Sequence, residues 1–246
     1  MIPEDKINEF VSRVREAAGT NLESVILYGS AVAGDFQPEF SNLNLFCVLR
    51  DSSFGSLHAL VPVAKWWDRQ KQPAPLLMTR GELERSTDVF TIELMDMKQH
   101  HRVLFGEDVL QGLEIPLQLH RVQVEYELRE KLILLRQQLL LLSDNKKGLW
   151  NLLVRSVPSF VTLFRHALIA LGEAPPATGK REAVQTLAKK IGFDPSAILQ
   201  VLDVRERKLD SGKVDVNELF SRYLATVQEV TAAVDQAMGQ DATGRP

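Results

Sequence analysis

Apolar residues recur at alternating helical and strand-like spacing along the first half of the chain. They follow helical spacing from Ile7 to Val14, which predicts a helix that ends at Gly19. A second helix is expected over residues 56–69, with a kink at Pro62. Short and almost wholly apolar runs predict strands at residues 24–28, 44–49, 75–79 and 89–95. Strands separated by helices predict an α/β domain.

The second half carries apolar stripes at helical spacing only. They predict helices at residues 120–143, 149–171, 181–191, from Asp194-Pro195 onward and 216–238, with residues 174–177 as a linker. Helices joined by short connections predict a bundle. The expected fold class is therefore α+β. An α/β domain over residues 1–116 precedes an all-α bundle over 117–238 and a flexible tail over 239–246.

Charge and cysteine content narrow the function classes. The 246 residues carry a net charge of −3 with a pI near 6.0, which argues against a surface devoted to nucleic acid. Cys47 is the sole cysteine, so a disulfide framework and a thiolate zinc cluster are excluded, and a reducing cytoplasm is the expected location. We expect Cys47 to be a core residue. The start of the chain does not resemble a secretory signal, and no run predicts a membrane span.

The segment between the first two predicted strands carries the chemistry. Tyr28-Gly29-Ser30 ends the first strand, and Asn42-Leu43-Asn44 leads into the second after eleven residues. Glycine lets a backbone approach a ligand, and a serine hydroxyl can bind a phosphate oxygen. By itself, Gly-Ser more often marks a tight turn. The longer pattern resembles the signature of the nucleotidyltransferase fold superfamily, which includes aminoglycoside and MNT-type nucleotidyltransferases.

This resemblance implies a metal site that the sequence does not complete. In the family, Gly-Ser is followed by Asp-x-Asp or Asp-x-Glu, and the two acids hold divalent metal that binds the nucleoside triphosphate. Here Asn42 and Asn44 occupy both acid positions, and Ala33 stands where an arginine is common. Two negative charges are missing where Mg²⁺, the expected ion if the protein is active, would bind. Whether the protein is an enzyme stays open, and an inactive or weakly active one is favoured.

Three acidic residues remain near the motif. Glu93 would project from the polar face of the strand at 89–95, where the family often has a third carboxylate; a solvated edge residue is an equal alternative. Asp35 and Glu39 could approach a metal, although such residues more often cap a short helix or face water.

Two arginines of the first bundle helix are further candidates. Arg129 and Arg136 are seven residues apart and share a helix face, so with Gly29 and Ser30 they are our candidate nucleotide-binding residues, facing a cleft between the domains. Glu125 stands four residues before Arg129, so an ordinary salt-bridged surface is the alternative.

Three functions follow from these patterns. The leading hypothesis is a catalytically impaired nucleotidyltransferase homologue that keeps a nucleotide- or phosphate-binding cleft. The second is an active metal-dependent enzyme that moves NMP from NTP to a small-molecule or protein hydroxyl. The third is an interaction scaffold whose helical half docks a partner or a second copy. No nucleic-acid module and no membrane partner is expected.

Overall fold

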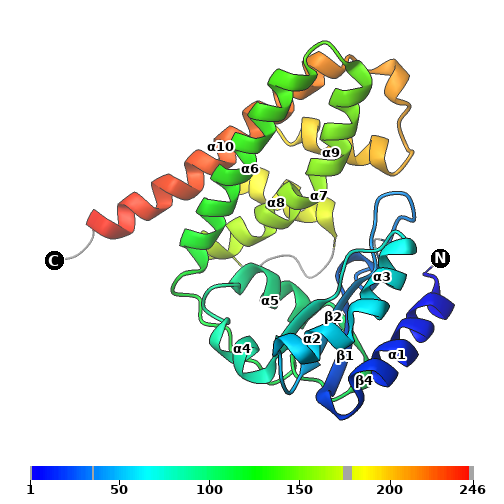
Figure 1. Ribbon diagram of the computed structural model, residues 1–246. Coiled ribbons are helices and arrows are strands. Elements are labelled where there is room, and N and C mark those ends of the chain that lie inside the picture. Colours follow the sequence, from blue (N-terminus) through cyan, green and yellow to red (C-terminus); the bar gives the residue numbers. More distant parts are fainter. Residues whose placement is uncertain (1, 35, 174–178, 244–246) are drawn as a thin grey trace. The chain divides into compact units, whose positions relative to one another are not determined.

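The computed structural model describes residues 2–34, 36–173 and 179–243, and side chains as far as Gln236. The chain forms two compact units, residues 1–117 and 118–246 (Figure 1). Each unit is described separately below.

The first unit is built on a four-stranded mixed sheet. In chain order its elements are α1 (Glu4–Ala18), η1 (Gly19–Asn21), β1 (Leu22–Tyr28), η2 (Gly29–Ala31), β2 (Asn44–Leu49), α2 (Phe54–Ala59), α3 (Val61–Arg69), β3 (Leu76–Thr79), α4 (Arg80–Arg85), α5 (Thr91–Gln99) and β4 (His101–Gly106). The strand order is β3-β2-β1-β4. β1 pairs antiparallel with β2 and β4, whereas β2 and β3 are parallel.

Helices cover both faces of this sheet (Figure 1). One face packs on α1 and α3, where Phe10 and Trp67 lie 4.9 Å apart between ring centroids. The other face packs on α4, α5 and residues 109–113. β2 alternates between these cores: Leu45 and Cys47 enter the first, and Phe46 and Val48 enter the second. Burial raises the pKa of the Cys47 thiol to about 12, so Cys47 is a core residue, as predicted.

Two local predictions in this unit are wrong. The run at 89–95 is not a strand, because α5 begins within it at Thr91, and the last strand of the sheet is β4. Thr91, Leu94 and Met97 are buried at a spacing of three, so the helical period prevails in a run too short to distinguish the two by pattern. The helix expected over 56–69 is two helices. Pro62 lies in the first turn of α3, where its missing N–H costs nothing.

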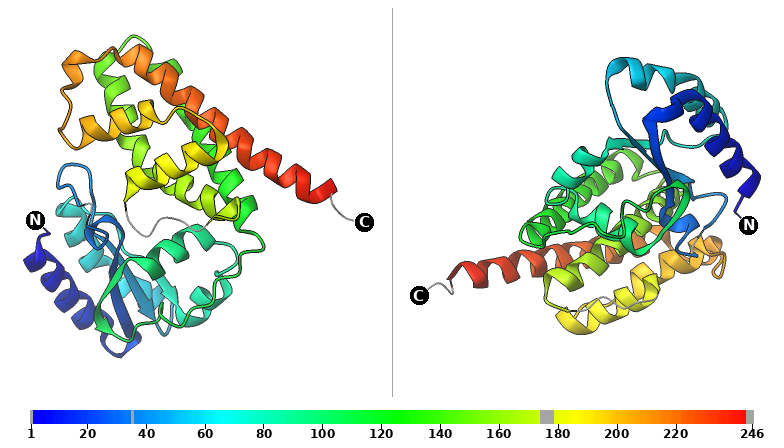
Figure 2. Two further views of the ribbon diagram at one scale, coloured as in Figure 1. Left: turned by 180° about the vertical axis from the view of Figure 1, so that it is seen from behind. Right: turned by 90° about the horizontal axis from the view of Figure 1, so that it is seen from below.

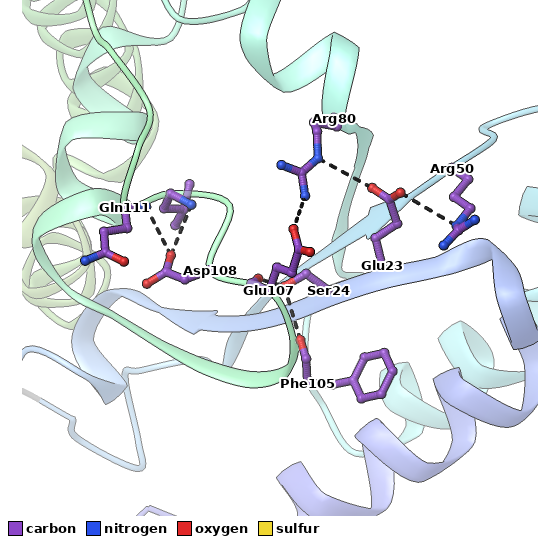
Figure 3. Close-up of polar contacts among 9 residues, drawn as sticks. Glu23, Ser24, Arg50, Arg80, Phe105, Glu107, Asp108 and Gln111 are labelled. Carbon is purple, nitrogen blue, oxygen red and sulfur yellow. Dashed lines mark hydrogen bonds and ion pairs between the residues drawn. The ribbon is translucent and has the colours of Figure 1, made fainter.

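β1 and β4 approach closely at their ends (Figure 3). The buried Ser24 hydroxyl donates hydrogen bonds to the carbonyl oxygens of Phe105 (3.2 Å) and Glu107 (2.7 Å). Arg80 lies above this join with Nη2 2.7 Å from Glu107 Oε2, and Arg80 Nε is 3.8 Å from Glu23. These contacts fix the chain as it leaves the sheet.

The second unit is helical. Its elements are α6 (His120–Leu142), α7 (Lys146–Ala170), α8 (Lys180–Ile191), α9 (Ser196–Arg205), η3 (Ser211–Lys213) and α10 (Val216–Thr243). α7 packs against α6, α8, α9 and α10, and α10 also packs along α6 (Figure 2). α10 continues past Gly239, where a flexible tail was expected to begin. The predicted linker at 174–177 lies outside the described residues.

Among the described residues, α7 alone has the length and apolar composition of a membrane span. More than half of its most apolar window is buried inside the unit, as in the core helix of a bundle. Helix α6, which holds the leucine-rich run, does not meet that test.

Candidate functional site

The turn after β1 has the backbone that the motif predicts. Gly29 has φ +77°, a left-handed conformation that favours glycine. Its carbonyl accepts hydrogen bonds from the N–H groups of Val32 (2.9 Å) and Ala33 (3.0 Å), which closes the turn. The half-buried Ser30 hydroxyl forms no hydrogen bond within the described part of the chain. It is therefore available to a ligand.

Asn44 packs directly against this turn. It is the first residue of β2 and pairs across the sheet with Tyr28. A Cβ atom added to Gly29 would lie 2.9 Å from Asn44 Nδ2. A side chain at position 29 would therefore have to adopt an unfavourable backbone conformation and displace the amide of Asn44.

Asn42 lies in the segment before β2. The N–H of Leu43 is bound by Gln72 Oε1 at 2.8 Å, which anchors this segment to the end of α3. Leu43 and Leu45 are both buried in the core beneath α1 and α3, whereas Asn42 is exposed and Asn44 half-buried. This alternation places the two asparagines on the opposite side from the leucines, two positions apart.

Glu93 is on a different element from the one expected, yet near the motif. It is an exposed residue in the first turn of α5 and not a strand residue. Burial raises the pKa of Tyr28, and the negative charge of Glu93 raises it further. Glu93 is therefore close enough to Tyr28, at the end of β1, to act on its phenol, and its role in the Gly-Ser site stays a prediction.

The donors that the structure describes at this turn do not fit a hard dication. No group of three or more His, Cys, Asp or Glu side chains gathers in a metal-binding arrangement among the residues described. Asp35 lies outside those residues, and Glu39 is exposed in the loop before β2. The two amides contribute no negative charge where Mg²⁺ prefers carboxylate oxygen.

A histidine–aspartate pair adjoins the motif and was not anticipated. Tyr28 pairs with Asn44 on one side and with His101 of β4 on the other. His101 Nε2 lies 3.0 Å from both carboxylate oxygens of Asp108. Burial alone would raise the pKa of Asp108, but its hydrogen bond with His101 leads the interactions that lower it. The alignment of Asn44, Tyr28 and His101 across the sheet could not be predicted from the sequence, because β4 was not predicted.

The two arginine candidates lie on α6. Arg129 Nε is 2.6 Å from Glu125 Oε1 and Nη2 is 3.1 Å from Asp235 Oδ1. These carboxylates, Glu125 foremost, raise the pKa of Arg129 and satisfy its charge inside the helical unit. Arg136 is exposed. A phosphate-binding role for either residue stays a prediction.

One solved structure gives a direct comparison for this fold. No protein-family model matches the chain, and no curated protein matches it. The crystal structure of spectinomycin adenyltransferase AAD(9) from Enterococcus faecialis with ATP and spectinomycin is similar to it with a TM-score of 0.58 at 16% identity. The similarity covers 92% of this chain and 98% of the other. The chain therefore has a nucleotidyltransferase-like fold, with an N-terminal α/β region followed by a helical part, as predicted.

Proposed function

We propose that this protein binds a nucleoside phosphate at the Gly29-Ser30 turn and is impaired in metal-dependent nucleotidyl transfer. The observation that carries the proposal is the packing of the neutral amide of Asn44 against Gly29, with Asn42 in place of the second acid. Neither residue supplies the charge that a bound dication requires.

The loss of two carboxylates affects catalysis more than binding. Stabilisation of charge developing in a transition state by a metal or a fixed donor supplies several kcal/mol, which corresponds to roughly three orders of magnitude in rate. A phosphate can still be bound in the ground state without that charge, through neutral hydrogen-bond donors. An amide N–H₂ group donates hydrogen bonds, whereas a carboxylate repels a phosphate unless a cation lies between them.

The retained groups support a phosphate ligand. The left-handed turn at Gly29 lets a ligand approach the backbone, Ser30 offers an unused hydroxyl, and Asn44 offers an amide beside Gly29. The similar structure of the spectinomycin adenyltransferase was solved with ATP, which makes a nucleotide the first ligand to test. A cytoplasmic protein, with its single buried cysteine, is part of the same proposal.

Calorimetric titration with ATP, CTP, GTP and UTP, with and without Mg²⁺, tests this proposal. We expect binding without metal and no release of pyrophosphate. Restoring both acids by Asn42→Asp with Asn44→Asp should make binding stronger in Mg²⁺ and weaker without it. Binding of the unaltered protein that requires Mg²⁺ would instead support the active enzyme. The absence of any nucleotide binding would contradict both.

A pair of glycine variants locates the site. Gly29→Ala places a methyl group against Asn44, whereas Gly34→Ala has open space at a similarly left-handed φ of +81°. Both variants strain the backbone, but only the first fills the proposed site. We expect Gly29→Ala to lose nucleotide binding and Gly34→Ala to keep it. Equal loss in both variants would point to general strain of the loop instead.

An apolar surface on α6 favours the interaction scaffold as a second candidate. Val122, Tyr126, Ile133, Leu140 and Leu141 are large and exposed, and four of them recur at intervals of four and seven residues. Such spacing is typical of a helix that packs on another helix. A second copy of this chain is the partner to test. A dimer by light scattering that Ile133→Gln with Leu140→Gln converts to monomer would support this candidate, and a monomer throughout would exclude self-association through this surface.

A further inference from the structure

A cavity of about 720 Å³ opens at one end of the helical unit. The first turns of α7 form one wall, and η3 with the start of α10 forms the other. It is lined by Lys146, Lys147, Trp150, Asn151, residues 211–214, Asp215 and Val216. This volume is within the range of pockets that hold small molecules. Every residue that lines it belongs to the unit of residues 118–246, and none belongs to the Gly29-Ser30 turn.

On the α7 side of the cavity, the lining residues form two pairs at a spacing of four residues. Lys146 lies four residues before Trp150, and Lys147 lies four residues before Asn151, so each pair shares a face. Lys146 is therefore one helical turn from the half-buried indole of Trp150, and Lys147 is one turn from the amide of Asn151. Lys213, the last residue of η3, adds a third ammonium group from the other wall.

The charges in this cavity are not balanced from within. Three lysines and one aspartate line it, a net charge of +2. The carboxylate of Asp215 is bound to the start of α10, where Oδ1 accepts hydrogen bonds from the N–H groups of Asn217 (2.8 Å) and Glu218 (3.4 Å). No ion pair of the three lysines occurs in the described part of the chain. On the same unit, Lys131 and Lys190 are paired with carboxylates at 2.8 and 2.6 Å.

The position of Lys146 and Lys147 adds to this imbalance. Both lie in the first turn of α7, which contains no acidic residue. A cation near a helix N-terminus is unfavourable because it opposes the helix dipole. An anion bound between the two walls would offset this repulsion, and the indole of Trp150 offers a planar surface beside the charges.

We propose that this cavity binds a small anion that carries a planar ring, with the chemistry of a nucleoside monophosphate. The phosphate lies among Lys146, Lys147 and Lys213, and the ring stacks on Trp150. The proposal concerns a second site and does not require the Gly29-Ser30 turn to bind anything.

Calorimetry of the full chain with AMP, adenosine and inorganic phosphate tests the proposal. AMP should bind more tightly than either fragment, because only AMP engages the lysines and the indole together, and its affinity should fall as salt increases. Equal affinity for AMP and inorganic phosphate would overturn the assignment of a ring. The absence of AMP binding would overturn the site.

Matched variants assign the binding to this cavity. Lys147→Gln with Lys213→Gln removes one charge from each wall and should weaken AMP binding by roughly tenfold. Lys65→Gln with Lys189→Gln removes two exposed lysines elsewhere that form no ion pair among the described residues, and it should leave the affinity unchanged. Trp150→Leu should weaken AMP binding but not phosphate binding, and Trp150→Phe should restore most of it. Equal effects of the two lysine pairs would contradict the proposal.

The same titrations in the Gly29→Ala background separate the two proposed sites. We expect AMP binding and its loss in Lys147→Gln with Lys213→Gln to persist in that background. This expectation for the lysine cavity holds even if the Gly29-Ser30 turn binds no nucleotide, because the two sites are tested by different substitutions. If AMP binding disappears with Gly29→Ala alone, the ligand occupies the first unit and the lysine cavity is not its site.

Discussion

At Gly106 the end of β4 approaches β1 so closely that no side chain fits. The residue has φ +76°, and a Cβ atom there would lie 1.9 Å from the carbonyl oxygen of Glu23. The flexible end of a side chain could move away, but a strand backbone held by the Ser24 hydroxyl cannot. Gly106→Ala must therefore separate the two strands or rebuild the turn.

We expect Gly106→Ala to lower the free energy of unfolding by about 2–4 kcal/mol, because the substitution adds a backbone clash to a strained left-handed conformation. Urea denaturation followed by circular dichroism measures this change. Gly55→Ala is the control because the space around Gly55 is open and it lies within α2. That substitution should be neutral or stabilising. A loss below 1 kcal/mol for Gly106→Ala would show that the strand ends separate easily.

Tyr28 reports on the distance between Glu93 and the candidate site. Burial raises the pKa of Tyr28 first, and the charge of Glu93 contributes in the same direction. A negative charge favours the neutral phenol, so its removal must lower the pKa. Glu93→Gln should therefore shift the Tyr28 titration to lower pH, while Asp88→Asn should not, because Asp88 is an exposed acid that is not among the causes of the Tyr28 shift.

Ultraviolet difference titration follows the phenolate, and Tyr28→Phe identifies the signal among the three tyrosines. An unchanged Tyr28 titration in Glu93→Gln would place Glu93 away from the Gly-Ser turn. Its candidacy as a site residue would then end.

On the scale of elements, Arg121 joins the start of α6 to the end of α7. Its Nε and Nη2 donate to the carbonyl oxygen of Ala170 at 3.1 and 3.0 Å. The carbonyl groups of a helix C-terminus lack partners within the helix, and a cation there also complements the helix dipole. This contact therefore stabilises α7 and fixes its packing on α6.

Arg121→Met keeps much of the aliphatic part of the side chain and removes the guanidinium group that binds Ala170. We expect it to lower the free energy of unfolding by about 1.5–3 kcal/mol, the range for hydrogen bonds to a charged group. Arg136→Met on the exposed part of α6 is the control and should change it by less than about 0.5 kcal/mol. Thermal unfolding of both variants measures the difference. Similar stability of the two would show that Ala170 finds another donor.

The elements also show what periodicity can and cannot predict. Long apolar stripes identified α6, α7 and α10, because a stripe that recurs over many turns excludes the strand period. The run after Val89 is too short for that distinction, so α5 was assigned as a strand and β4 was missed. Because β4 was missed, the alignment of Asn44, Tyr28 and His101 across the sheet was missed as well. Cross-strand neighbours depend on strand pairing, which no local sequence pattern contains. The Gly-Ser turn, in contrast, was predictable because its residues are contiguous.

On the scale of the whole molecule, acid should destabilise both units. Hydrogen bonds and ion pairs lower the pKa of Glu4, Asp51, Glu82, Asp194 and Glu206, and Asp108 shifts in the same direction. In Glu82 the leading cause is the N–H of Thr79, which binds the carboxylate at 2.7 Å. In Asp51 it is the hydroxyl of Ser53. These carboxylates belong to residues 1–117, except Asp194 and Glu206 of the second unit.

The direction in which stability changes with pH follows from the linkage between proton binding and folding. A carboxyl group with a lower pKa in the folded than in the unfolded chain holds fewer protons when folded, so its contribution is complete above the unfolded value. The ordinary values are 3.8 for Asp and 4.5 for Glu, so stability should fall as the pH decreases from about 5 through these values. Melting temperatures between pH 7 and about pH 3 should show this decline.

Glu82→Gln should make the decline shallower. Glu84→Gln on the same helix should not, because its carboxylate accepts no hydrogen bond among the described residues. If both variants follow the unaltered protein, the Thr79–Glu82 contact does not persist in solution, and the acid sensitivity must come from the other carboxylates.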